Sequence, residues 1–124
     1  MSTQKVANEL VKLCSAGKFS EAESLYSPNI VSVEPSAPPG QAREVRGIAA
    51  VKAKEHAWNA SHEVHSCKVE GPLISDSHFA VTFKMDLTAK PQNKRIQMDE
   101  IAVYQVAGDK IVHEEFFYQT GAAA

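Results

Sequence analysis

The sequence predicts an α+β fold in which three N-terminal helices pack against a cone-shaped, curled antiparallel sheet. Residues before Ser61 repeat apolar side chains at intervals of three and four, as amphipathic helices do. After Ser61 the pattern changes to the two-residue alternation of strands, in four successive segments. Helices followed by antiparallel strands define the α+β class, and long strands twist and curl. Because 124 residues is the size of one domain, we expect residues 1–124 to form a single domain.

Two short helices are expected at the N-terminus. In residues 3–16 the apolar side chains fall on one stripe, with Thr3 as the expected N-cap and Gly17 as a left-handed stop. A second helix is predicted from the Ser-x-x-Glu capping box that begins at Ser20. We expect Pro28 to end it, because proline interrupts a helix.

A short strand and an irregular loop precede the third helix. Residues 29–35 are rich in β-branched side chains and predict a strand that presents Glu34 at its end. Residues 35–46 contain three prolines and a glycine, a composition typical of a lid or an edge loop. The third helix is expected over residues 47–61, with Glu55 on its apolar face.

Four long strands complete the predicted sheet. Alternation is clearest in the second, where odd positions are apolar and several even positions are polar. The strands are expected over residues 62–71, 78–89, 95–106 and 110–119, with Gly71-Pro72, residues 75–77, residues 90–94 and Gly108-Asp109 in the turns. A curled sheet with a long helix across its concave face leaves a cone with an open mouth, where ligands commonly bind.

Composition excludes several classes of function. Thirteen basic and fifteen acidic side chains give a net charge of −2, which predicts neither a nucleic-acid nor an anionic-membrane partner. The apolar stretches are shorter than the roughly 20 residues of a membrane span, and the N-terminus lacks the continuous apolar core of a secretion signal. We expect Cys14 and Cys67 to be reduced, small apolar residues of a cytoplasmic protein.

Three segments carry a resemblance to a known family. They are LYSPNIVSVEP at 25–35, REVRGIAAVKAKEHAWNASHEVHSCKVEGP at 43–72 and GDKIVHEEFFY at 108–118. Together they resemble the polyketide cyclase SnoaL-like group of the nuclear transport factor 2-like superfamily. The resemblance implies a cone-shaped α+β barrel that pairs as a homodimer through its sheet. The superfamily includes cyclases, ketosteroid isomerases, epoxide hydrolases, dehydratases and non-catalytic domains, so the fold does not choose among them.

The resemblance also bears on the position of a catalytic acid. Epoxide hydrolase-like members place an essential carboxylate on the last strand, shortly after the isoleucine of the turn that enters it. Counted from Ile111, that position is Phe116, so the required carboxylate is missing. Isomerase-like members imply an acid on the preceding strand, near Glu100; a register slip of one residue would put Asp99 there instead.

Carboxylates near the expected cone are the main catalytic candidates, since burial raises a carboxyl pKa toward the range useful for proton transfer. The acids concerned are Glu34, Glu55, Asp99, Glu100, Glu114 and Glu115. We favour Glu100 and Glu114 as catalytic residues, because even parity places them with Tyr104, Phe116 and Tyr118. The alternative for each acid is a surface or hydrogen-bonded structural role, and a bulge would reverse the parity.

His65 is the third catalytic candidate, as a general base or an orienting donor, because uninterrupted alternation puts it on one face with Cys67. The alternative is a structural histidine at the junction of helix and strand. The five histidines show none of the tight spacings of metal ligands, so no metal site is expected. There is no glycine-rich phosphate loop or nucleotide fingerprint, and no cofactor is expected.

The remaining candidates would contact a ligand. The predicted ligand-binding residues are Glu34, Trp58, Tyr104, Phe116 and Tyr118. Trp58 fits packing between helix and sheet as well, and both Tyr26 and Tyr118 could donate a hydrogen bond to a carbonyl oxygen. We therefore predict a homodimer that binds a compact, largely apolar organic molecule and isomerises, cyclises or dehydrates it by acid–base proton transfer. The alternative is a non-catalytic ligand-binding or dimerisation module.

Overall fold

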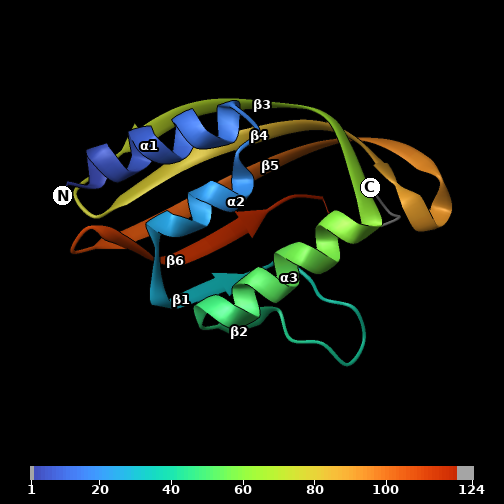
Figure 1. Cartoon of the computed structure of the whole chain (residues 1–124), viewed down its shortest axis with the longest axis horizontal. Helices are drawn as coiled ribbons and strands as arrows, with labels where there is room; N and C mark the ends of the chain where they lie inside the picture. The colour runs from blue at the N-terminus through green and yellow to red at the C-terminus, as the bar shows by residue number, and fades with distance from the viewer. Residues whose placement is uncertain (1, 120–124) are drawn as a thin grey trace.

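The computed structural model describes residues 2–119, which form three α-helices packed on a six-stranded sheet (Figure 1). The helices are α1 (Thr3–Ser15), α2 (Phe19–Ala22) and α3 (Ile48–Ser61), with short 3-10 turns at Glu23–Leu25 and Lys90–Gln92. The strands are β1 (Tyr26–Val33), β2 (Glu44–Arg46), β3 (His62–Ile74), β4 (His78–Ala89), β5 (Lys94–Ala107) and β6 (Lys110–Phe117). None of the helices within these residues is long and apolar enough to span a membrane.

The sheet curls around the helices. Its strand order is β2-β1-β6-β5-β4-β3, and Figure 1 shows α1 along β3 and β4, with α3 beside β1 and β2. The predicted α+β fold with a curled sheet is confirmed. The sheet is mixed rather than wholly antiparallel, however, because β1 and β6 pair in parallel. Helix α3 therefore stands over the place where the N-terminal strand meets the C-terminal one.

Helix α1 fixes one side of the core. Its N-cap is Ser2 rather than the predicted Thr3, since the Ser2 side chain accepts the N–H of Lys5 at 3.1 Å. Gly17, with a φ of +74°, follows the helix in the left-handed conformation that the sequence predicts. Between these ends the apolar stripe faces the sheet, and Leu10 is 1% exposed.

The segment after α1 departs from the prediction in two places. Helix α2 begins at Phe19, so Ser20 lies inside it and forms no capping box. Pro28 lies inside β1 instead of ending a helix. A proline is tolerated there because the pairing of β1 with β6 is irregular between Tyr26 and Val31, and no regular ladder hydrogen bond is lost.

Strand β3 contains a bulge that moves His65 to the outer face of the sheet. Its pairing with β4 shifts between Val64 and Ser66, so His65 is the extra residue. His65 Nε2 lies 2.7 Å from Thr88 Oγ1, whereas Cys67 packs against the core on the inner face. The prediction that His65 and Cys67 share a face is therefore wrong, because one inserted residue breaks the alternation.

Several element boundaries also differ from those expected: β1 begins at Tyr26 and ends at Val33, and β6 ends at Phe117 rather than at residue 119. Strand β3 continues through Gly71-Pro72, where a turn is predicted, because pairing with β4 resumes at Leu73 after a second bulge. The segment predicted to be irregular contains the short strand β2, which pairs antiparallel with β1. The turns around Asn93 and Gly108 lie where the sequence places them.

The core fills the space between the helices and the inner face. On β4 every odd position is buried: Phe79, Val81, Phe83, Met85, Leu87 and Ala89. Cross-strand register puts Tyr104 opposite Phe79, with the two rings stacked 4.8 Å apart, and puts Glu100 opposite Phe83. The apolar inner face therefore becomes polar toward the middle of β5.

We expect Leu10→Ala to lower the free energy of unfolding by about 2–5 kcal/mol, because it removes a buried side chain and leaves a cavity between α1 and the sheet. Urea denaturation followed by circular dichroism measures the change. Lys12→Ala, an exposed position on the same helix, is the control and should change stability by less than about 0.5 kcal/mol. Equal effects of the two substitutions would contradict the assignment of α1 to the core.

Candidate functional site

The candidate site lies on the inner face where β1, β6 and β5 run side by side. Register places Glu114 of β6 opposite Tyr104 of β5 and beside Ser32 of β1. Phe116 lies opposite Ala102, two positions along β5 from Glu100. The predicted parity of Glu100, Glu114, Tyr104 and Phe116 is confirmed, since no bulge interrupts β5 between Glu100 and Tyr104.

Glu114 is a carboxylate without solvent exposure. Its side chain is 0% exposed and accepts two hydrogen bonds, from Tyr26 Oη at 2.6 Å and from Ser32 Oγ at 2.7 Å. Burial raises the pKa of Glu114, and the two hydroxyl donors and the ammonium of Lys54 oppose that rise. Each carboxyl oxygen therefore accepts a hydrogen bond from a hydroxyl group of the protein.

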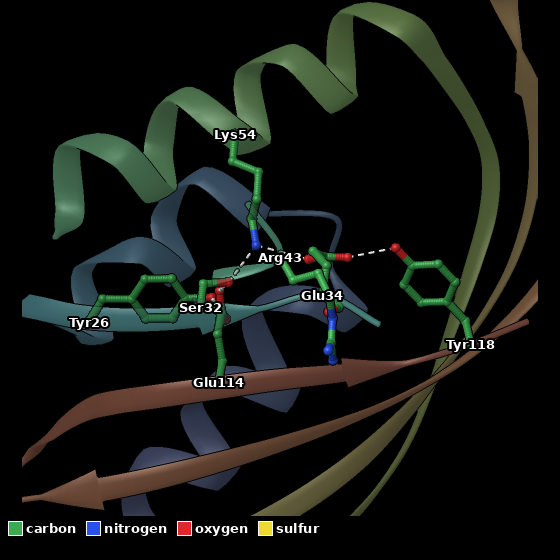
Figure 2. Close-up of polar contacts among 7 residues, drawn as sticks. All are labelled: Tyr26, Ser32, Glu34, Arg43, Lys54, Glu114 and Tyr118. Carbon is green, nitrogen blue, oxygen red and sulfur yellow. Dashed lines mark hydrogen bonds and ion pairs between the residues drawn. The ribbon is translucent and has the colours of Figure 1, made fainter. Parts of the chain in front are cut away.

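Lys54 brings a positive charge into the site from α3. Figure 2 shows its side chain reaching down between Ser32 and Glu34. Nζ lies 2.5 Å from Ser32 Oγ and 2.8 Å from Glu34 Oε2, and 5.4 Å from the centre of the Phe116 ring. Ser32 can serve both neighbours, since its hydroxyl proton goes to Glu114 while a lone pair accepts from the ammonium.

Glu34 joins Lys54 to Tyr118. Tyr118 Oη donates a hydrogen bond to Glu34 Oε1 at 2.6 Å. Lys54 Nζ donates one to the other carboxyl oxygen, Oε2 (Figure 2). Burial, followed by the hydrogen bond to Glu34, raises the pKa of Tyr118, which stays protonated. The main chain of Glu34 is fixed by two hydrogen bonds with Arg43, at 2.8 and 3.0 Å. Strand β1 thus delivers Glu34 just past its end, as the sequence predicts.

These contacts form one continuous interior chain of hydrogen bonds. Its members are, in order, Tyr26, Glu114, Ser32, Lys54, Glu34 and Tyr118. The Glu114 end is buried, whereas the side chains of Lys54 and Glu34 are 26% and 23% exposed. The Glu34–Tyr118 end is therefore more accessible to a ligand than Glu114 is.

Glu100 stands beside the interior chain without joining it. Within residues 2–119 its carboxyl makes no side-chain hydrogen bond or ion pair. Burial, with the nearby charges of Glu34 and Glu114, raises the pKa of Glu100 to about 8, although Lys54 acts in the opposite direction. A group that is mainly protonated near neutral pH, yet readily ionised, can both donate and accept a proton.

Glu55 forms a second acidic position, on the α3 face toward the N-terminal segment. Burial and the neighbouring Glu23 raise its pKa to about 9. It therefore carries a proton near neutral pH and adds no charge to the interior chain. The prediction that Glu55 lies on the inward side of α3 agrees with this burial.

An open groove of about 480 Å³ reaches the site at the end of β6. Glu100 and Tyr118, of the residues on the inner face of the sheet, line this groove. Most of the other walls come from the outer side of the sheet: Thr82, Lys84, Asp99, Ile101, Phe117 and Gln119. Since β6 stops at Phe117, opposite Ile101, the groove passes around the end of that strand. We call it the mouth groove.

The other predicted site residues lie away from the mouth groove. Trp58 stacks on His62 at 4.3 Å, at the junction of α3 and β3. Tyr104 is buried and contacts Phe116 edge-on, with ring centres 6.4 Å apart. His65 lies on the outer face. Among residues 2–119 there is no group of three or more histidine, cysteine or acidic side chains able to hold a metal ion.

Sequence reasoning missed two residues of the interior chain, Ser32 and Lys54. Ser32 alternates with Ile30 and Glu34, so the parity of the predicted strand contained this signal. Lys54 follows Val51 by three positions and precedes Trp58 by four, which places a lysine on the apolar stripe of α3. A lone charge on such a stripe is a sign of a buried partner.

The chain matches a known family along most of its length. The family described as SnoaL-like domain matches residues 1–118. A Mesorhizobium loti structure described as a SnoaL-like polyketide cyclase is 34% identical, with a TM-score of 0.89 over 95% of this chain and 100% of that chain. No curated protein matches.

More distant structures show the fold alone. A Bacillus subtilis structure described as an isomerase is 17% identical, with a TM-score of 0.72 over 93% of this chain and 84% of that one. A Xanthomonas campestris protein described as having a cystatin-like fold is 16% identical, with a TM-score of 0.77 over 97% and 92%.

We expect a carboxyl carbon signal that titrates near pH 8 in ¹³C NMR and disappears in Glu100→Gln. The raised pKa also links Glu100 to stability. Because the folded value of about 8 exceeds the ordinary 4.5, the protonated carboxyl stabilises the fold fully below pH 4.5, and this contribution is lost as the pH rises through 8. Over this range the free energy of unfolding should fall less in Glu100→Gln than in the wild type. A Glu100 signal that titrates at 4.5 would contradict the assignment.

Proposed function

Because the chain belongs to the SnoaL-like family, we propose that it binds a small, largely apolar organic molecule and catalyses cofactor-free proton transfer on it. The observation that carries this proposal is the position of Glu100. Its carboxyl lacks a side-chain hydrogen-bond partner among residues 2–119 and lines the mouth groove beside Tyr118. A groove of about 480 Å³ falls within the range of small-molecule sites.

Glu100 is the proposed acid and base. With a pKa of about 8, the protonated carboxyl can give its proton to a carbonyl oxygen, and the ionised form can take one from the adjacent carbon. Isomerisation, aldol-type cyclisation and dehydration can each begin with removal of a proton beside a carbonyl. The resulting enolate then takes a proton at another carbon, adds through carbon to a second carbonyl whose oxygen is protonated, or expels a β-hydroxyl group that leaves as water after protonation. The 34% identical structure is described as a SnoaL-like polyketide cyclase, which supports this class of reaction for the chain.

Tyr118 and Glu34 are proposed to orient the substrate. The Tyr118 hydroxyl is held by Glu34 at the accessible end of the interior chain, so its position relative to Glu100 is fixed. Phe116 offers an apolar surface under Lys54. Glu114 is proposed as a positioning residue, because it is buried and holds Ser32 in place for Lys54. The outer-face position of His65 gives it no part in this mechanism.

We also propose a homodimer that pairs through the outer face of the sheet. Ile101 and Phe117 are cross-strand partners there, and they are 50% and 44% exposed. Large apolar side chains exposed together are typical of an interaction surface. This surface also suits the alternative function, a non-catalytic dimerisation module.

The two free cysteines fit a reducing compartment such as the cytoplasm.

The proton-transfer proposal can be tested with 5-nitrobenzisoxazole, an uncharged probe that opens to a coloured cyanophenolate when a base removes its ring C–H proton. The carboxylate takes the proton as the N–O bond breaks. We expect the wild-type rate to rise with pH through about 8, as Glu100 ionises. Glu100→Gln should lower kcat/KM by about 10²-fold or more, because the base is lost.

Glu115→Gln provides the matched control for this test. It is the same substitution on the neighbouring strand β6, on the opposite face of the sheet beside Val33 and Val103, and it should retain the wild-type rate. Equal rates in the wild type and Glu100→Gln would exclude Glu100 as the base. Absorbance of the phenolate product measures each rate directly.

The dimer proposal predicts a solution mass of twice the 13.5 kDa of one chain. Ile101→Lys should reduce it to the mass of one chain, because a charge in the apolar patch must be desolvated on pairing. Size-exclusion chromatography with light scattering measures the mass. Lys110→Ala, at an exposed position of β6 outside the patch, is the control. A wild-type monomer would overturn the proposed pairing.

A further inference from the structure

We infer that Glu34 sets the charge selectivity of the site, so that an uncharged ligand binds better than an anion of the same shape. Glu34 would do this by holding the ammonium of Lys54. The inference rests on the proposed function, since it concerns the ligand of that same site. It adds the chemical class of the ligand and the residue that selects it.

The charge of the Lys54 ammonium is balanced before a ligand enters, and two of its three N–H donors already have acceptors. An ammonium has three N–H donors. In this site Nζ contacts Ser32 Oγ and Glu34 Oε2, and it lies over the Phe116 ring at 5.4 Å. Its charge is balanced by Glu34 at 2.8 Å. Lys54 therefore behaves toward a ligand as part of a neutral pair.

The other charges around the mouth groove also disfavour an anion. The groove is lined by the carboxyl group of Asp99 and by Glu100, which is mainly protonated near neutral pH and supplies no positive charge. The lysine of the groove, Lys84, has its Nζ 3.6 Å from Glu70 Oε1. An anion that entered would lose its hydration without gaining a free counter-charge. An uncharged carbonyl compound loses less hydration and can accept a hydrogen bond from protonated Glu100.

Removal of the Glu34 charge should reverse this selectivity. In Glu34→Gln the ammonium keeps its contact with the uncharged Ser32 hydroxyl but loses its ion pair. Glu114 is not a direct ion-pair partner of Lys54, because Ser32 lies between them: its hydroxyl donates to Glu114 and accepts from the ammonium. Among residues 2–119 the ion pair of Lys54 is with Glu34. The released charge of Lys54 then lies at the accessible end of the interior chain, where an anion can reach it.

Two probes of the same two-ring shape test the inference: 2-naphthamide, which is uncharged, and 2-naphthoate, which is an anion. Ligand-observed NMR titrations at neutral pH give both dissociation constants. For the wild type we expect 2-naphthamide to bind at least about tenfold more tightly than 2-naphthoate. In Glu34→Gln the ratio of the two constants should shift toward 2-naphthoate by at least about tenfold, because one unpaired charge is exposed.

Three further variants make the test specific. Glu115→Gln changes the net charge equally on the opposite face and should keep the wild-type ratio. Adding Lys54→Met to Glu34→Gln should abolish the shift of the ratio toward 2-naphthoate, because tighter binding of this anion requires the ammonium of Lys54. Glu34→Ser removes the same carboxylate and replaces Glu34→Gln if that variant does not fold, as judged by circular dichroism.

The outcomes separate the inference from the proposed function. If both probes bind and Glu34→Gln leaves their ratio unchanged, the charge selectivity is wrong while the small-molecule site stands. If 2-naphthoate binds the wild type as tightly as 2-naphthamide, the inference is also wrong. If neither probe binds any variant, the proposed site fails and the inference fails with it.

Discussion

The burial of Glu114 is the constraint on which the site depends. A carboxylate removed from water is destabilising unless donors and a counter-charge surround it. Here the donors, Tyr26 and Ser32, come from β1, and the counter-charge, Lys54, comes from α3. The parallel pairing of β1 with β6 puts Ser32 beside Glu114. The topology of the sheet therefore supplies one of the hydrogen-bond donors that stabilise this buried carboxylate.

The two glutamates Glu100 and Glu114, on one inner face, have different proposed roles because their surroundings differ. Glu114 and Glu100 share parity, and burial raises the pKa of both. The oxygens of Glu114 accept hydrogen bonds from two hydroxyl groups. These donors oppose the rise of its pKa and fix the position of its side chain. Glu100 makes no such contact within residues 2–119 and lines the mouth groove instead. The hydroxyl donors from β1, rather than the residue type, distinguish the hydrogen-bonded acid from the acid that we propose for proton transfer.

The sequence predicted the fold well because its signals are local and repeated. Alternation over many residues identified β4 and β5, and the same alternation placed Glu100 and Glu114 on one face. The prediction that His65 shares a face with Cys67 was wrong because the bulge after Val64 is an effect of strand pairing, which one strand alone does not reveal. Lys54 escaped notice for a related reason: its partners Ser32 and Glu34 lie some twenty positions away in the chain, on a strand brought under α3 only by the fold.

The mouth groove and the proposed dimer surface share Ile101 and Phe117. A partner chain that covered these side chains would narrow the groove from its outer side and leave Glu100 and Tyr118 on the inner side. Desolvation by the partner would also disfavour the ionised form of Glu100, because charge is less stable where water is excluded. In the proposed dimer, assembly and proton transfer are therefore coupled through the end of β6, although no residue of the interior chain lies in the interface.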